Sequence, residues 1–423
     1  MAMSARAKAA VGVLLIVVFL VGIGIGYYLP RPAPPVVKPI KVGVIYPLSG
    51  AMAKPGRDAR TCITMVVEEA NLKGGIKSMG GARIDLVWAD NRGDPKVGAS
   101  EAERLIIEEK VCMLVGSYSS SCTSTASEIA EKYGIPFLNP ESTSYRLIER
   151  GFEWFFRITP DDAFFSLAFF EIMDELNTKY PALPLKRIAI VYENTLWGAD
   201  CGAVQKKYAA ERGYEVVADI PYSAKALDLH PECSTLMAAK PDAVLITSYL
   251  ADAILWTKTW KEMNFHCNII LSMDVGFVDP GYFAAVGKDG DYIINRELFS
   301  ADLVEKKPAI ADAETKYYER TGEHLTGTPA RAYTAALLMV DVLERAGATD
   351  PESIRKALRE TNWPAEKVPL TWDGIKFDES GQNILAKGIL VQTFDATLYT
   401  IWPSQWASRE LVYPMPTWAE RGS

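Results

Sequence analysis

Short apolar segments alternate with helical segments from Ile40 onward, and this alternation restricts the fold more than any other feature of the sequence. Segments such as IKVGVIY, IDLVWAD and RIAIVYE are apolar along their whole length rather than at every second residue. A strand that is apolar on both faces belongs in a sheet covered on both sides, as parallel sheets are in α/β proteins. We therefore predict an α/β fold with doubly wound parallel sheets.

The alternation occurs twice along the chain. In the first series we expect strands at 40–50, 84–90, 111–118 and 135–139, with helices at 57–73, 95–109 and 123–133. A second series restarts near Lys186, with strands at 187–194, 214–222, 242–249 and 268–274 and helices at 199–212, 233–239 and 251–263. Helices at 308–321, 329–346 and 351–361 and a β-rich tail finish the chain. Two similar series in 423 residues predict two lobes of ordinary domain size.

An uncharged apolar run from Ala9 to Leu29 follows Arg6 and Lys8. It is long enough to cross a bilayer, and the positive flank predicts a cytoplasmic N-terminus and an exported body. We expect an uncleaved membrane anchor over 1–29, and a cleaved signal peptide remains the alternative. The proline-rich segment 30–39 is then a semi-rigid linker. Only about eight residues precede the run, which leaves no room there for a signalling domain.

Composition and motifs exclude several classes of function. The formal net charge of −8 argues against a nucleic-acid partner, which would require a basic surface. His230, His266 and His324 are far apart, and no H-E-x-x-H, G-x-S-x-G or phosphate-loop motif is present. The sequence also lacks a C-x-x-C pair and a Cys/His cluster. We therefore expect a binding protein, not an enzyme, with no cofactor and no metal.

Ligands bind beyond the carboxyl ends of the strands in open parallel sheets. The segments that follow the predicted strands therefore indicate where a ligand would lie. These segments are at Ser49, 117–122, 139–144, 193–197, Tyr249 and Asp274.

Over about residues 40–400 the chain resembles the branched-chain amino-acid-binding family of periplasmic proteins, which has the type I ligand-binding fold. The matching stretches, in order, are VGVIYPLSG, EEANLKGGIK, DPKVGASEAERLI, VGSYSSSCTSTASEIAEKYGIPFLNPESTS, RIAIVYENTLWGAD and PLTWDGIKFDESG. The resemblance implies an extracytoplasmic solute-binding protein that delivers an amino acid or similar small polar solute to the permease of an ABC importer. A sensor ectodomain, or a binder of amides, urea or aromatic acids, is the alternative.

The resemblance also implies the domain boundaries. It places the first lobe at 40–162 and 298–386, the second lobe at 163–297 and 387–410, and a C-terminal tail at 411–423. The chain then crosses between the lobes near residues 160, 297 and 386, and these crossings form the hinge.

Family members bind the α-carboxylate of the ligand with a serine after the third strand, which corresponds to Ser120 here. Its neighbours in this loop are Tyr118, Ser119 and Ser121, and the next loop supplies Glu141, Ser142 and Thr143. The family's acidic contact for the ammonium group corresponds to Asp274, and the aromatic residues of the second lobe correspond to Trp197 and Tyr249.

The chemistry of these residues agrees with the resemblance. A serine-rich helix N-terminus offers N–H groups, hydroxyls and a favourable dipole to a carboxylate, and an opposing Asp binds an ammonium group. Departures from the family concern the side-chain pocket. Asp274 is one methylene shorter than the Glu of branched-chain binders, and Trp197 stands where several members have Tyr. These differences put leucine-type specificity in question.

The six cysteines divide into three in each predicted lobe. The family's usual first-lobe disulfide corresponds to Gly93 and Ser119, so that bridge is absent here. Candidate pairs are Cys62–Cys122 and Cys201–Cys233, because exported proteins can form disulfides.

Overall fold

The computed structural model describes residues 2–11, 13–15, 37–273 and 275–421, which fall into two compact units, 1–38 and 39–423. In the first unit, residues 5–11 and 13–15 are helical. No helix among the described residues has both the length and the apolar character needed to cross a membrane. Most of the apolar run 9–29 and most of the linker 30–39 lie outside the described residues.

Five parallel strands form the sheet of the first lobe, in the order β2-β1-β3-β4-β5. Successive side chains of β1 point to opposite faces of the sheet, since Val44 packs into one apolar cluster and Ile45 into another. Helices α2 and α12 contribute to the first cluster, and α3 and α4 to the second. The elements are β1 (Ile40–Tyr46), α2 (Ala53–Leu72), β2 (Ile84–Asp90), α3 (Pro95–Ile107), β3 (Leu114–Gly116), α4 (Ser120–Tyr133), β4 (Phe137–Asn139), α5 (Arg146–Glu149) and β5 (Phe155–Arg157).

Seven strands form the sheet of the second lobe, in the order β14-β13-β10-β9-β8-β6-β7. The strands from β7 to β10 are parallel, whereas β13 and β14 pair antiparallel at one edge. The elements are α6 (Asp162–Lys179), β6 (Arg187–Glu193), α7 (Leu196–Arg212), β7 (Glu215–Tyr222), α8 (His230–Ala239), β8 (Ala243–Thr247), α9 (Leu250–Glu262), β9 (Ile269–Ser272), α10 (Pro280–Val286), β10 (Ile294–Glu297), β13 (Ile389–Phe394) and β14 (Thr397–Trp402).

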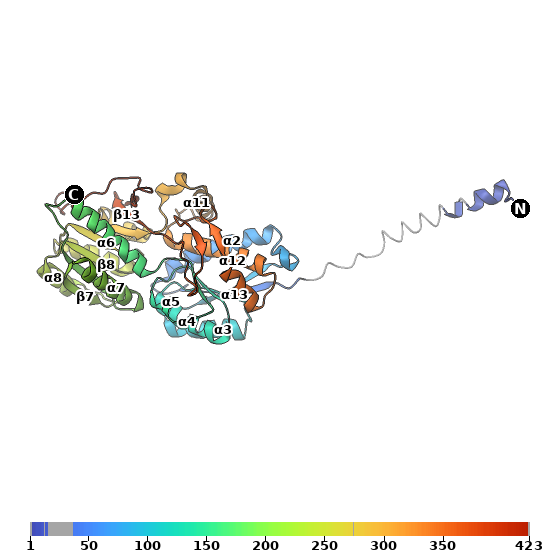
Figure 1. The fold of residues 1–423 in the computed structure, drawn as a ribbon, viewed down its shortest axis with the longest axis horizontal. Coiled ribbons are helices and arrows are strands. Elements are labelled where there is room, and N and C mark those ends of the chain that lie inside the picture. The colour runs from blue at the N-terminus through green and yellow to red at the C-terminus, as the bar shows by residue number, and fades with distance from the viewer. Residues whose placement is uncertain (1, 12, 16–36, 274, 422–423) are drawn as a thin grey trace. The chain divides into compact units, whose positions relative to one another are not determined.

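The segment between β10 and β13 returns to the first lobe. It contains α11 (Pro308–Thr321), α12 (Gly327–Ala346), α13 (Pro351–Arg359) and the small antiparallel sheet of β11 (Asn362–Pro364) and β12 (Gly374–Lys376). Helix α12 packs along α2 although more than 250 residues separate them, and Figure 1 shows them side by side. The chain therefore passes between the two sheets three times, after β5, after β10 and before β13.

The structure confirms the predicted α/β fold with parallel sheets. Strand β2 has the predicted bounds, and helices α7, α11, α12 and α13 begin or end within three residues of theirs. Three elements between the predicted series were missed, α5, β5 and α6. The apolar pattern of helix α6 is weak because its outer face also carries apolar residues, such as Phe164, which is 36% exposed.

The candidate disulfides are wrong, because all six cysteines are buried free thiols. Cys201 packs in the cluster on one face of the second sheet and Cys233 in the cluster on the other face. The sheet itself separates these two sulfur atoms. In the first lobe, Cys62 lies in the core under α2, whereas Cys122 lies on α4, which covers the opposite face.

This burial makes a prediction about thiol reactivity. Burial raises the pKa of Cys233 to about 11 and that of Cys112 to about 12, so both thiols stay protonated and unreactive at neutral pH. We expect the native protein to react slowly with a thiol-specific reagent such as Ellman's reagent. Denatured protein without reductant should release six equivalents. Four or fewer equivalents would show that a disulfide is present.

Candidate functional site

A small cavity lies between the carboxyl ends of the strands of the two sheets. Its accessible volume is only about 20 Å³, room for about one water molecule, so the lobes lie closed against each other here. Its lining comes from both lobes and consists of Tyr118, Ser120, Glu141, Ser142, Thr143, Trp197, Tyr249, Val275, Arg296 and Arg331. Seven of these ten residues were predicted from the sequence as ligand contacts.

The N-terminus of α4 forms one wall of the cavity. Ser119 is the N-cap residue, and its hydroxyl accepts a hydrogen bond from the backbone N–H of Cys122 (3.4 Å). Ser120 is the first helical residue and lines the cavity with its side chain buried. Ser121 is half-buried and does not line the cavity. Ser119 therefore caps the helix, and Ser120 faces the cavity.

The loop after β4 is held in place by the side chain of Asn139. This amide donates to the carbonyl of Gly116 (2.7 Å) and accepts from the backbone N–H of Ser142 (3.1 Å), so it joins the loops that follow β3 and β4. The hydroxyl of Ser142 lies 2.6 Å from that of Thr123. Ser142 thus stabilises the loop, and Thr143 lies beside it on the cavity wall.

A buried ion pair spans two elements of the first lobe at the cavity. The guanidinium Nε of Arg331 on α12 donates to Glu141 Oε2 at 2.7 Å, and both side chains are about 1% exposed. The same guanidinium donates to the hydroxyl of Thr328 (3.1 Å). A desolvated pair of this kind needs such additional hydrogen bonds, because removing either partner leaves a charge without compensation. The pair fixes the loop that carries Glu141 against α12.

Three aromatic rings meet at the centre of the site. Tyr249 lies at the start of α9 in the second lobe, with its ring centroid 4.9 Å from Trp197 and 6.3 Å from Tyr118 of the first lobe. Burial raises the pKa of Tyr249 well above its usual range. Because the rings occupy the space between the lobes, a solute that enters must separate Tyr118 from Tyr249.

The side chain of Trp197 is held by a hydrogen bond to the carboxylate of Asp162. Its indole N–H donates to Oδ1 of Asp162 at 3.2 Å, and both side chains are buried. Glu193 fixes the start of the same helix, because its carboxylate accepts from the backbone N–H groups of Thr195 (2.7 Å) and Gly198 (2.8 Å). The orientation of Trp197 is therefore set by its helix and by Asp162.

The two lobes also bond to each other beside the cavity. The hydroxyl of Ser144 donates to Asp200 Oδ2, and Arg146 Nε lies 2.9 Å from Asp200 Oδ1. Ser144 and Arg146 belong to the first lobe, whereas Asp200 lies on α7 of the second and is fully buried. At the crossing itself, the backbone N–H of Asp162 donates to the carbonyl of Thr143 (2.8 Å). These contacts define a closed arrangement of the lobes.

Sequence reasoning missed Val275, Arg296 and Arg331. Arg331 is the one charge in the stretch TPARAYTAA, which was a usable sign of a buried functional residue, whereas Arg296 is followed directly by Glu297. The predicted ammonium contact Asp274 lies outside the described residues. Its neighbour Val275 lines the cavity. No group of three potential metal ligands occurs in the part of the chain that the structure describes.

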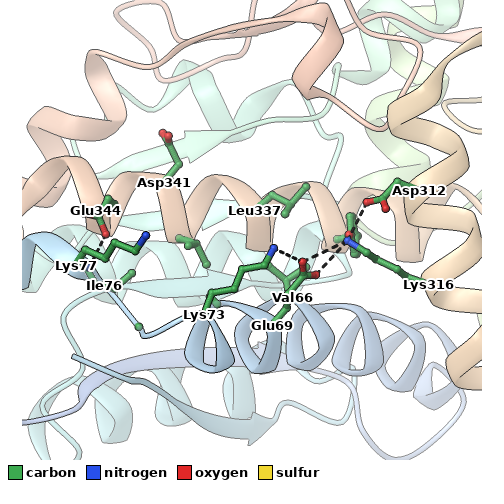
Figure 2. A pocket seen from close by; sticks show the side chains of 14 residues that line it. Val66, Glu69, Lys73, Ile76, Lys77, Asp312, Lys316, Leu337, Asp341 and Glu344 are labelled. Carbon is green, nitrogen blue, oxygen red and sulfur yellow. Dashed lines mark hydrogen bonds and ion pairs between the residues drawn. The ribbon is translucent and has the colours of Figure 1, made fainter. Parts of the chain in front are cut away.

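A wider groove, with a volume of about 640 Å³, lies on the first lobe between α2, α11 and α12 (Figure 2). None of the predicted ligand contacts lines it. Its charges are satisfied within the protein, since Lys73 and Lys316 bond to Glu69, and Glu344 accepts from backbone N–H groups. The cavity between the lobes is therefore the better candidate for a solute site, despite its smaller volume.

Two α/β lobes that close on a small cavity define a two-lobed solute-binding protein. Residues 39–386 match the model of the periplasmic binding protein family, so the chain belongs to this family. It is 28% identical over 392 residues to Leu/Ile/Val-binding protein homolog 7 of Brucella abortus (strain 2308), covering 90% of this chain and 96% of the relative. The predicted family, the solute-binding function and the absence of enzymatic activity are confirmed.

Solved structures share the fold. The branched-chain amino acid transporter substrate-binding protein of Streptococcus pneumoniae, in complex with isoleucine, has a TM-score of 0.74 at 22% identity, covering 89% of this chain and 100% of that chain. A solute-binding protein of an ABC transporter from R. palustris, in complex with benzoate, has a TM-score of 0.74 at 19% identity, covering 86% and 95%.

The buried ion pair generates a stability prediction. Arg331→Met should lower the free energy of unfolding by about 3–5 kcal/mol, because it leaves Glu141 charged and buried without the guanidinium. Lys356→Met removes one member of an exposed pair on α13 and should change it by less than about 1 kcal/mol. Urea unfolding followed by circular dichroism measures both. Equal effects of the two substitutions would contradict the assigned role of the Arg331–Glu141 pair.

Proposed function

We propose that this protein captures an amino acid, or a similarly small carboxylate, outside the cytoplasm and delivers it to the permease of an ABC importer. The observation that carries the proposal is the cavity itself, which is enclosed by side chains of both lobes at the carboxyl ends of their strands. In this closed arrangement the cavity has an accessible volume of only about 20 Å³, so a solute would enter when the lobes separate.

The N-terminus of α4 is the proposed carboxylate site. Ser120 presents its hydroxyl and the start of the helix presents N–H groups, and both favour an anion in a site shielded from water. Thr143 faces the same cavity from the next loop. Asp274, two residues after β9 in the sequence, is the proposed partner of the ammonium group.

We propose hinge closure without chemistry as the mechanism. The hinge consists of the three crossings between the predicted lobes 40–162 with 298–386 and 163–297 with 387–410. A solute that contacts both lobes stabilises only the closed arrangement, so binding shifts the population toward it. The bonds of Asp200 with Ser144 and Arg146 would then form on closure and present both lobes to the permease in one fixed geometry.

Aromatic acids are the second candidate class of solute. Tyr118, Trp197 and Tyr249 offer ring faces and edges that pack well against a planar ligand. The R. palustris protein of the same fold is described in complex with benzoate. A carboxylate on such a ring would use the same site at α4.

We also propose that the N-terminal apolar run 9–29 anchors the protein to the membrane, with segment 30–39 as the linker to an extracytoplasmic body. The support is the length of the uncharged run and the preceding Arg6 and Lys8. Cell fractionation followed by N-terminal sequencing tests this, because recovery of a soluble protein lacking the run would show a cleaved signal peptide.

Ser120→Ala tests the carboxylate site. Loss of a hydrogen bond to a charged group should weaken binding of leucine or benzoate roughly tenfold or more, as measured by isothermal titration calorimetry. Ser124→Ala, one turn further along α4 and away from the cavity, is the matched control and should leave affinity unchanged. Retained affinity in the Ser120 variant would refute the proposed site.

Asp274→Ala separates the two solute classes. An amino acid should lose affinity by roughly tenfold or more, because its ammonium group loses an ion pair, whereas benzoate has no such group and should bind at least as well. A thermal-shift screen of amino acids, amides and aromatic acids first selects the solutes to titrate. Unchanged binding of amino acids to this variant would remove Asp274 from the site.

A further inference from the structure

Asp162 connects the two halves of the solute site. It is the first residue of α6, at the point where the chain passes from β5 into the second lobe, and it is fully buried. Its backbone N–H donates to the carbonyl of Thr143 in the first lobe (2.8 Å). Its carboxylate accepts from the indole of Trp197 in the second lobe (3.2 Å). Thr143 and Trp197 both line the cavity, whereas Asp162 does not.

Several elements surround this carboxyl group. Thr143 approaches it from the loop after β4, Trp197 and Cys201 from α7, Arg296 from β10, and Arg157 and Asp161 from β5 and the residue before the helix. Burial raises the pKa of Asp162 to about 6, against the opposing effects of the Thr143 hydroxyl and the Arg296 charge. The neighbours from both lobes together exclude water from the group.

We propose that Asp162 is a positioning residue of the solute site, which orients the Trp197 indole and ties it through Thr143 to the first lobe when the lobes close. This inference rests on the proposed function. If the hinge opens, Thr143 moves away from Trp197 with its lobe, and water reaches the carboxyl group. Asp162 therefore links the geometry of the aromatic wall to the state of the hinge.

The sign of the pH dependence follows from burial. A carboxyl group whose pKa is raised in the closed state binds its proton more tightly there than in an open, hydrated state, so the closed state gains as the pH falls through about 6. This gain is lost as the pH rises above 6. If the open-state pKa is the ordinary one, solute affinity should be roughly tenfold higher at about pH 5 than at about pH 7.

A first test needs no solute. The fluorescence difference between the wild-type protein and Trp197→Phe isolates the emission of one of the ten tryptophans. This difference should titrate with a midpoint near pH 6 in the wild type, because protonation changes the acceptor of the indole N–H. In the Asp162→Asn background it should not titrate over this range.

The second test measures binding of leucine, isoleucine and benzoate by calorimetry at about pH 5 and about pH 7, a range in which their own charges stay constant. Asp162→Asn keeps an oxygen acceptor for Trp197 but cannot titrate, so its affinity should be the same at both pH values. Asp162→Ala removes the acceptor and should bind more weakly than the Asn variant at both. If the Asn variant binds more tightly than the Ala variant, Asp162 acts by orienting Trp197 and not only by stabilising the fold.

Asp252→Asn is the matched control. This carboxyl group is also buried, with its pKa raised to about 7 by desolvation, but its hydrogen-bond partner Tyr222 lies in the same lobe. Closure should leave its surroundings unchanged, so this variant should keep the wild-type ratio of affinities. Thermal unfolding monitored by circular dichroism verifies that each variant is folded.

Two results would overturn the inference: an emission titration that survives Asp162→Asn, or an Asn variant that keeps the full pH dependence of binding. Failure of the proposed function is distinguishable from either. In that case the wild-type protein binds none of the three solutes, while the emission titration still reports whether Asp162 controls Trp197.

Discussion

The strands of both sheets end at one cleft, and the rest of the functional architecture depends on this constraint. Parallel strands direct all their carboxyl ends to the same edge, so the loops after β3 and β4 and those after β6 and β8 converge without any need for special sequence. Each such loop leads into a helix or a turn with exposed N–H groups. The cavity is thus a consequence of topology, and its chemistry is set by the few side chains placed at those ends.

Buried charge gives this cavity its rigidity on the side of the first lobe. The Arg331–Glu141 pair holds the loop after β4 against α12, and Asn139 ties that loop to the one after β3. Such groups are costly to desolvate and stabilise only one arrangement of their partners. The walls of the first lobe are therefore fixed, and the adjustable part of the site is the boundary between the lobes, where Asp200 and Asp162 bond across it.

Much of the fold was predictable because local patterns agree with the tertiary structure. Strand β2 and helix α11 were predicted with their full bounds, since each is preceded or followed by a clear turn or Gly signal. Helix α6 was missed because its outer face carries apolar residues such as Phe164, which weakens the periodicity that reveals a helix. The disulfide predictions failed for a related reason, since sequence spacing does not show that a sheet lies between Cys201 and Cys233.

The sequence by itself determined the fold class, the family and most of the residues at the mouth of each strand, including Ser120, Thr143, Trp197 and Tyr249. These follow from local signals, namely apolar runs, helix starts and ordered motifs, which act over a few residues. Only the tertiary structure showed that Arg331 and Arg296 join them, and that Asp162 bridges Thr143 and Trp197. Those contacts join residues far apart in the chain, so no local pattern in the sequence reveals them.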